Sequence, residues 1–463
     1  MSEPVAASSS GLKRVALIDH WSAGGVSRFL FALITVMARM HPETTFVYFV
    51  GELNVIRDDL YSKLASYDNV LVRPIRHLPP PETEEEQIER GAFWRVSVGL
   101  LKRMPRLHRA LLDAYVAFRD RNIQEPEPVH WFEYELEEDS RTELELCEVI
   151  YLGWPYFIKP FDTQVPVVAT FHDFHYKYFP RDYPPDVMDV VEAQTPEWLR
   201  RCSMFITSSV FIQSDVLKFY GDVAPPHEVV YLAPYGLETP SEELIEEALE
   251  RLEIRRPYVL YSGAPSPHKN VGSLIRAVGI MRDRGTPVQL IITGVGTDVL
   301  GRCSEVPESS IVYPLCAAID EVGLRWGDDF LALGYVSNSD VDALSAAAAA
   351  VVSPSTYEAG CGPALDAWQR GVPVAFSNIP PFVEQLDHLG VEAYVFDPND
   401  PEDIADKVRE AVFDVARSRE MADRSRVAIQ RCTWEDTARG YYGVFQRVAG
   451  LGAGSQASDR SDG

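Results

Sequence analysis

The sequence predicts an α/β protein built from two domains, each with a parallel sheet. Short apolar strands alternate with amphipathic helices along most of the chain, which is the pattern of parallel α/β units. The 463 residues exceed what one ordinary core buries, so two domains of roughly 200 residues each are expected. Hydrophobic residues make up 46% and charged residues 24% of the chain, as in globular proteins.

The first α/β series begins at a buried strand over residues 14–19, followed by Gly24-Gly25 and an amphipathic helix. Further strands are expected at residues 46–50, 70–72, 165–170, 204–207 and 228–231. The alternation breaks over residues 79–148, which open with prolines and glutamates and end in an acidic run. We interpret this segment as an insert in the first domain, because charge runs are usually solvated surface.

The second series begins at a strand over residues 257–262, after a charged helical stretch. Its further strands are expected at residues 288–293, 330–333, 350–353, 373–376 and 393–396. We therefore predict the following division: a disordered tail over 1–11, a first domain over 12–240 with the insert 79–148, a second domain over 255–432, a C-terminal helix over 433–450 that can pack back on the first domain, and a disordered tail over 451–463.

Charge and cysteine usage restrict the partners and the location. The net charge of −26 disfavours nucleic acid and anionic lipid surfaces, since both need basic patches. No apolar run reaches the roughly 18 residues that span a bilayer, and the N-terminus lacks the features of a signal peptide. The six cysteines show no close pairing, which favours reduced thiols over a zinc site or disulfides. We expect a cytoplasmic protein without stable membrane association.

The most informative stretch runs from a predicted strand into a helix that we expect to begin near Pro363. Two carboxylates, Glu358 and Asp366, flank a glycine-rich turn made of Gly360, Cys361 and Gly362. Glycine lets the backbone approach a ligand closely, and the N–H groups of a helix start suit a phosphate. A carboxylate only accepts hydrogen bonds, so a ribose diol is a natural partner. The layout favours a nucleotide diphosphate that carries a sugar.

Lys269 follows the first predicted strand of the second domain, at the strand end where open α/β sheets bind ligands. A lysine there can neutralise a departing diphosphate as a point charge. A single lysine at a helix start is more often a surface residue. We favour the functional interpretation because Glu358 and Asp366 belong to the same domain.

Asp340-Val-Asp342 has the Asp-x-Asp form of metal-dependent glycosyltransferases. It directly follows Ser337-Asn-Ser at a predicted helix start, where serine or aspartate caps the helix and acids complement its dipole. We favour capping, and we expect neither a metal site nor a cofactor.

Three second-domain patterns resemble the retaining glycosyltransferases of family 4: Gly-x5-Lys-Asn at Gly263, Leu333-Gly-Tyr-Val, and Glu-x7-Asp enclosing Gly-x-Pro-Ala-Leu. In the first domain the resemblance rests on Gly24-Gly25 and Thr170-Phe-His-Asp173. The family has the GT-B fold, in which two Rossmann-like domains face each other across a cleft. The resemblance implies a metal-independent hexosyltransferase that uses a nucleotide-diphosphate sugar and retains its configuration.

The resemblance also implies roles for single residues. Glu358 matches the acid at the donor sugar, and His172 matches a histidine that reaches this sugar from the first domain, so both are candidate catalytic residues. Lys269 matches the diphosphate ligand, and Asp366 matches the ribose ligand. The remaining donor-binding positions are Gly24, Gly25, Gly334, Tyr335, Val336, Gly360, Cys361, Gly362 and Pro363.

Two departures keep other functions open. The family commonly has an arginine close to the lysine, where this chain has His268 and Ala264, and His268 offers only a partial, pH-dependent charge. Asp366 replaces the usual glutamate. The alternatives are a nucleotide-sugar epimerase on the same fold and a non-catalytic sugar-nucleotide-binding protein.

The acceptor is the least determined partner. Acidic stretches over residues 82–86 and 133–148 flank the one basic cluster, residues 95–109. Acids beside that cluster oppose docking on an anionic membrane. We expect a soluble acceptor, either a small molecule or a soluble glycan.

Overall fold

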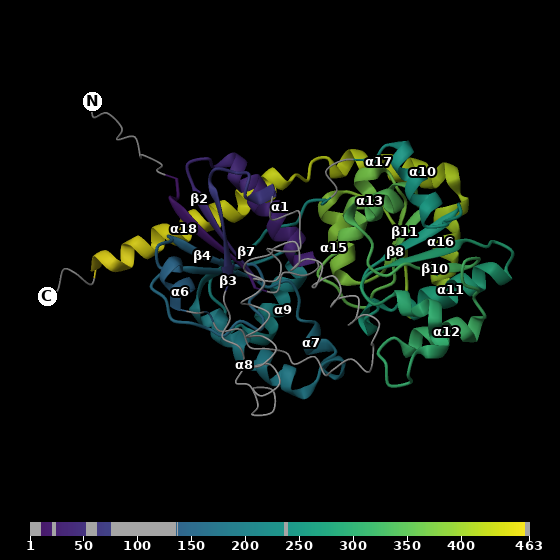
Figure 1. The fold of residues 1–463 in the computed structure, drawn as a ribbon, viewed down its shortest axis with the longest axis horizontal. Helices are drawn as coiled ribbons and strands as arrows, with labels where there is room; N and C mark the ends of the chain where they lie inside the picture. The colour runs from purple at the N-terminus through teal and green to yellow at the C-terminus, as the bar shows by residue number, and fades with distance from the viewer. Residues whose placement is uncertain are drawn as a thin grey trace, which may run out of the picture.

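The structure is a computed structural model that describes residues 11–20, 25–51, 63–75, 136, 138–235 and 239–458, without the side chains of Asp186 and residues 451–458. It contains two parallel α/β domains that lie side by side (Figure 1). The predicted insert falls mostly outside the described residues, as do Gly24 and the basic cluster at residues 95–109.

The first sheet is entirely parallel, with the order β3-β2-β1-β4-β5-β6-β7. Its strands are β1 (Arg14–Asp19), β2 (Thr45–Gly51), β3 (Val70–Ile75), β4 (Val149–Leu152), β5 (Val167–Thr170), β6 (Cys202–Thr207) and β7 (His227–Val229). Helix α1 (Gly25–Met40) covers one face. The other face packs against α6 (Glu138–Leu144), α8 (Pro185–Arg201) and α9 (Val210–Tyr220).

The second sheet is also parallel, with the order β10-β9-β8-β11-β12-β13, which is the Rossmann order. Its strands are β8 (Tyr258–Ser262), β9 (Gln289–Thr293), β10 (Phe330–Ala332), β11 (Ala350–Ser353), β12 (Val374–Ser377) and β13 (Tyr394–Phe396). One face packs against α11 (Val271–Asp283), α12 (Tyr313–Val322) and α16 (Pro401–Phe413). The other packs against α10 (Glu242–Arg251), α13 (Asn338–Ala347), α14 (Gly362–Arg370) and α15 (Pro380–Leu389), and α17 (Val415–Ile429) contributes to both cores. The predicted α/β architecture is confirmed.

The last helix, α18 (Trp434–Ser458), returns from the second domain and packs beside α1 on the first (Figure 1). The indole N–H of Trp434 donates to the carbonyl oxygen of Pro234 (2.8 Å), and the hydroxyls of Tyr442 and Thr44 lie 2.7 Å apart. The helix extends past residue 450, where we predicted that it would end. No helix in the described ranges, α18 included, is both long and apolar enough to cross a membrane.

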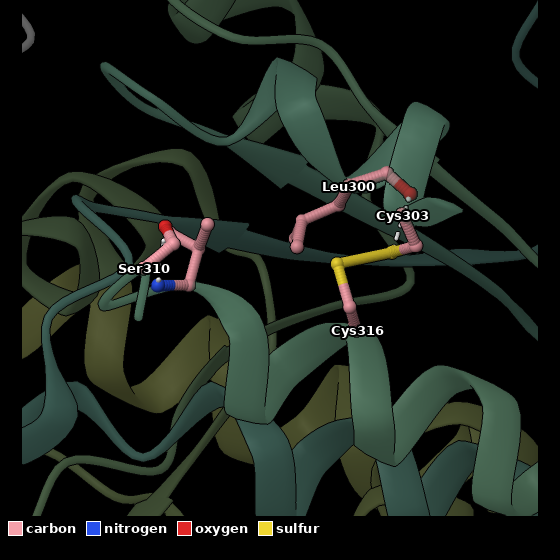
Figure 2. Close-up of a disulfide and its surroundings, with 5 residues drawn as sticks. Leu300, Cys303, Ser310 and Cys316 are labelled. Carbon is pink, nitrogen blue, oxygen red and sulfur yellow. Dashed lines mark hydrogen bonds between the residues drawn. A yellow bond between two sulfur atoms is a disulfide. The ribbon is translucent and has the colours of Figure 1, made fainter. Parts of the chain in front are cut away.

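The expectation that the cysteines are unpaired is wrong for one pair. Cys303 lies in the 3-10 segment η3 (Asp298–Glu305) and Cys316 in α12, and the two form a disulfide with their Cα atoms 5.2 Å apart (Figure 2). The chain turns back between these two segments, so cysteines 13 residues apart meet without any short spacing motif. The other four cysteines are free. This disulfide removes one of the two arguments for a cytoplasmic location.

Candidate active site

The strand order of the second sheet reverses between β8 and β11, and open α/β sheets bind ligands at the carboxyl ends of such strands. Lys269 ends the short 3-10 segment η2 (Pro267–Lys269) after β8, and Glu358 lies in the loop after β11. Lys269 Nζ donates to Glu358 Oε1 at 2.5 Å, and this oxygen also accepts the Ser355 hydroxyl at 2.8 Å. The fold thus joins two predicted site residues that are 89 positions apart in the sequence.

Hydrogen bonds fix the two loops that carry this ion pair. The backbone N–H and the hydroxyl of Thr356 both donate to the carbonyl oxygen of His268, at 2.8 and 3.1 Å. Asn270 donates through its side-chain amide to the carbonyl oxygen of Pro354 at 3.0 Å. Its backbone is left-handed (φ 55°), a conformation that asparagine tolerates better than most residues. The positions of Lys269 and Glu358 are therefore set by backbone contacts.

The glycine-rich turn leads into α14 as predicted, with Pro363 in the first helical turn and Cys361 at the N-cap position. The N–H of Cys361 donates to Gln385 Oε1 at 2.9 Å, so a protein group already satisfies it. A Cβ atom added at Gly360 or Gly362 would meet nothing closer than 3.9 Å. The space in front of the turn is open.

Asp366, the predicted ribose ligand, lies in α14 and already has a protein partner. The residue is 7% exposed, and its Oδ1 accepts the N–H of Tyr235 at 2.8 Å. Tyr235 belongs to the segment that connects the two domains, so Asp366 ties this connection to α14. Asp366 also borders a cavity of about 160 Å³ between the domains, lined by Gly25, Arg28, Tyr235, Leu260, Ser262, Val341, Ser345, Val351, Gly362 and Pro363.

Arg28 is a site residue that the sequence reasoning missed. Its guanidinium lies over the Tyr235 ring, 5.2 Å from the centroid, and it lines the same cavity as Asp366. The available signal was helical spacing, since Arg28 lies three residues after Gly25 on α1 and so shares its face. His268 adds no positive charge beside Lys269, because burial lowers its pKa to about 2.

The loop after β10 contains Gly334, Tyr335 and Val336. Gly334 has φ +69° and accepts the N–H of Gly294 at 2.8 Å, Tyr335 is 75% exposed, and Val336 is half-buried. Gly294 has φ +140°, and a Cβ atom there would lie 2.2 Å from the carbonyl oxygen of Gly263. The loops after β8, β9 and β10 therefore touch through glycines, a contact that the sequence did not reveal.

His172 approaches from the first domain, in the loop after β5. Its Nε2 lies 2.9 Å from the carbonyl oxygen of Gly153, which can only accept, so Nε2 carries the proton. Burial lowers the pKa of His172 to about 4, so the ring is neutral near pH 7 and Nδ1 presents a lone pair. Gly24 lies outside the described residues, and Gly25 is the first residue of α1, with nothing within 4 Å of a Cβ atom added to it.

Asp173 connects the first-domain loop electrostatically to the ion pair. Burial is the main cause of its raised pKa; the charge of Glu358 also raises this pKa and the charge of Lys269 lowers it. Its Oδ1 accepts the N–H of His175 at 3.2 Å. The carboxylate of Asp173 therefore lies close enough to the Lys269–Glu358 pair to feel both charges across the domain boundary.

Tyr357, the residue before Glu358, inserts its side chain into the first domain. It is 5% exposed, its hydroxyl accepts the N–H of Phe174 at 2.8 Å, and it donates to Asp215 Oδ2 at 3.2 Å. Its ring lies 4.9 Å from that of Tyr178. The loop that carries Glu358 is therefore anchored in both domains.

The Asp-x-Asp segment takes part in a helix cap and in two ion pairs. Ser337 is the N-cap of α13, and its hydroxyl accepts the N–H of Asp340, as the capping interpretation predicted. The carboxylate of Asp340 pairs with Arg251, and that of Asp342 pairs with Arg370 at 2.7 Å. Both acids have arginine partners.

Comparisons with known proteins bear on the fold and on the class of activity. Residues 245–427 match the family model described as glycosyl transferases group 1. The O-antigen chain mannosyltransferase B of Escherichia coli is 28% identical over 296 residues, which cover 62% of this chain and 72% of that protein. These two similarities support glycosyltransferase activity.

Solved structures with similar folds cover nearly the whole chain. HepE of Anabaena, solved with UDP and glucose, has a TM-score of 0.59 and 16% identity, over 94% of this chain and 100% of that one. Sucrose-phosphate synthase of Thermosynechococcus elongatus has a TM-score of 0.60 and 15% identity, over 95% and 100%. WaaG, a glycosyltransferase involved in lipopolysaccharide biosynthesis, has a TM-score of 0.58 and 12% identity, over 93% and 99%. The predicted GT-B fold is confirmed.

Proposed function

We propose that this chain is a metal-independent, retaining hexosyltransferase that moves a sugar from a nucleotide-diphosphate sugar to a hydroxyl of a soluble acceptor. The observation that carries the proposal is the Lys269–Glu358 ion pair at the switch point of the second sheet, beside the start of α14. Two relatives add support, since one is named as a mannosyltransferase and HepE was solved with UDP and glucose.

Binding of the donor follows from the Lys269–Glu358 pair, on the loops after β8 and β11, and from the groups that line the cavity. Lys269 and the helix start at Gly362 attract the diphosphate, and Arg28 brings a second cation from the first domain. When the diphosphate replaces Glu358 as the partner of Lys269, the Glu358 carboxylate can accept hydrogen bonds from hydroxyls of the sugar. Asp366 remains the proposed ribose ligand, and its carboxylate then serves the Tyr235 N–H and the ribose together.

The transfer step breaks the bond between the anomeric carbon and the diphosphate and forms one to the acceptor oxygen on the same face. Lys269 and the start of α14 stabilise the negative charge that grows on the diphosphate. The acceptor proton passes to the departing phosphate oxygen. His172 accepts a hydrogen bond from a hydroxyl of the sugar through Nδ1, because its Nε2–H donates to the carbonyl oxygen of Gly153.

Donor entry requires the domains to separate. The cavity of about 160 Å³ is smaller than the roughly 300 Å³ at which ordinary ligand pockets begin. We interpret the described arrangement as the closed one, in which Tyr357 of the second domain hydrogen-bonds to the first domain; closure excludes water, whose attack on the donor is the competing reaction.

The soluble acceptor follows from the acidic chain, with its net charge of −26. Its test is co-sedimentation with anionic liposomes at low salt, where we expect no binding. Clear binding that disappears when Lys102, Arg103 and Arg106 are neutralised would contradict this part of the proposal.

The main test is a thermal-unfolding screen with nucleoside diphosphates, because a specific ligand raises the unfolding midpoint by mass action. The matching nucleotide sugars are then offered with acceptor panels, and the anomeric configuration of the product is read by NMR. Inversion would overturn the retaining mechanism. An epimer formed from donor alone would identify an epimerase, and donor binding without turnover would identify a binding protein.

A further inference from the structure

Three side chains outside the donor site converge at the boundary between the domains. His175 lies in the short helix α7 (His175–Tyr178), Asp182 in the 3-10 segment η1 (Pro180–Asp182), and His268 in η2 of the second domain. His175 Nε2, Asp182 Oδ2 and His268 Nδ1 are buried and have no hydrogen-bond partner among the described residues. One ligand atom from each residue fits within 4.8 Å of the other two. Buried polar atoms are rarely left without a partner, so this convergence needs a reason.

The hydrogen bond at the second ring nitrogen of His175 is compatible with metal binding at the first. His175 Nδ1 lies 2.7 Å from the Tyr183 hydroxyl, and with the proton on Nδ1 the ring presents a lone pair at Nε2. A metal-bound histidine typically holds its second nitrogen in such a hydrogen bond.

The surrounding groups are compatible with a bound cation. The Lys269 charge is felt by both histidines, but Lys269 is paired with Glu358 at 2.5 Å. The ring of Phe179 stacks on His175 with centroids 5.0 Å apart, and His175 is 7% exposed. The site is therefore mostly buried and contains one carboxylate.

We propose that His175, Asp182 and His268 form a zinc site that joins the two domains and keeps its fourth position for water. Two imidazoles and a carboxylate are a common ligand set for Zn²⁺. His175 Nε2 and Asp182 Oδ2 lie 3.5 Å apart, close to the roughly 3.3 Å that separates two ligand atoms in a tetrahedral site with bonds of about 2.0–2.1 Å.

The site acts on closure and takes no part in the sugar transfer. Two ligands come from the first domain and one from the second, beside Lys269, so bound zinc favours the closed arrangement. Exchange of donor and product requires opening, so saturating zinc should slow turnover at least several-fold, and His268→Gln should relieve this inhibition.

The test uses the full chain after treatment with a chelator, titrated with ZnCl₂ in a calorimeter. The parent should bind one zinc ion per chain. The zinc affinity should be lost, or weakened at least tenfold, in His175→Gln, Asp182→Asn and His268→Gln. Cobalt(II) should give the visible absorption of a low-coordinate site in the parent only. The matched control is His388→Gln, at another part of the domain boundary, where the ring stacks on Tyr231 and lies near Glu384.

The three variants separate the parts of the proposal. Thermal unfolding without metal checks that each variant folds like the parent. Parent-like zinc affinity in all three folded variants would overturn the site. Loss of affinity in the first-domain variants but not in His268→Gln would overturn the bridge between domains. These readouts need neither donor nor acceptor, so their failure would leave the proposed transfer reaction standing.

Discussion

The two sheet edges that meet at the candidate site differ in chemistry. The second-domain edge is charged: Lys269 and Glu358 are joined at 2.5 Å on loops that hydrogen-bond to each other. On the first-domain edge the histidine that approaches the site, His172, is neutral near pH 7, and the aromatic rings around Tyr357 hold the Glu358 loop in place. The difference teaches that the ion pair belongs to the second domain, while the first domain surrounds it with a neutral histidine and aromatic rings and adds the single cation of Arg28 at the neighbouring cavity.

The largest effect is expected when the negative charge of Glu358 is removed from the second-domain edge. Glu358→Gln keeps an oxygen that can accept from Lys269 and Ser355 but loses the carboxylate, so we expect kcat to fall roughly 10²–10³-fold with little change in stability. Steady-state kinetics and thermal unfolding measure the two quantities. Glu410→Gln on α16 is the control. Transfer within a few-fold of the parent would show that the edge does not carry the chemistry.

Lys269→Ala should weaken binding of the nucleoside diphosphate by about 1.5–3 kcal/mol, because a charged hydrogen bond is lost. The Glu358 carboxylate would also be left beside the phosphates without its cation. Calorimetry measures the affinity, and Lys407→Ala, which removes another ion-paired lysine of the same domain, should bind like the parent. Unchanged affinity in Lys269→Ala would count against the diphosphate role.

The neutral state of His172 at the first-domain edge is tested by the pH dependence of the free energy of unfolding. The pKa of His172 is about 4 in the folded chain and 6.5 ordinarily, so the unfolded chain binds the additional proton between these values. The free energy of unfolding should therefore decrease as pH falls from 6.5 to 4, by at most about 1.4 kcal/mol per pH unit from this group. Urea unfolding across this range should give a shallower dependence in His172→Gln. Parallel curves for parent and variant would contradict the neutral state of His172.

The smallest expected effect is that of chelation. Asp340 and Asp342 are paired with arginines, so the transfer step should not need a divalent ion. The initial rate after dialysis against EDTA should not fall below that before it. A complete loss restored by manganese would place a metal in the donor site and overturn the division of charge described above.

The fold was predictable because its signals are local. Each strand of the second sheet lies on an apolar run of the sequence. The start of α14 is indicated by Pro363 and the glycines before it. Charge at a strand end likewise indicated Lys269. These features depend on neighbours in the sequence, so periodicity and turn chemistry were sufficient to find them.

The remaining features arise from tertiary convergence. No spacing pairs Lys269 with Glu358 or Cys303 with Cys316, because the turns between them decide the contact. Asp366 Oδ1 accepts the N–H of Tyr235, which lies 131 residues earlier, in the segment between the domains. The sequence showed that Asp366 was polar and near a helix start, but it could not show which group of the fold would hydrogen-bond to its carboxylate.

The return of α18 to the first domain has a consequence for synthesis on the ribosome. The first-domain core includes residues from the very end of the described chain: Trp434, Ala438, Tyr441, Tyr442, Val444, Phe445 and Val448. The second domain has been translated in full before these residues are made. Its core can form while the first domain, although translated earlier, still exposes apolar surface beside α1. The first domain, although translated first, therefore completes its core only with the segment that is made last, and a chain truncated before residue 434 should expose apolar surface beside α1 and recruit chaperones there.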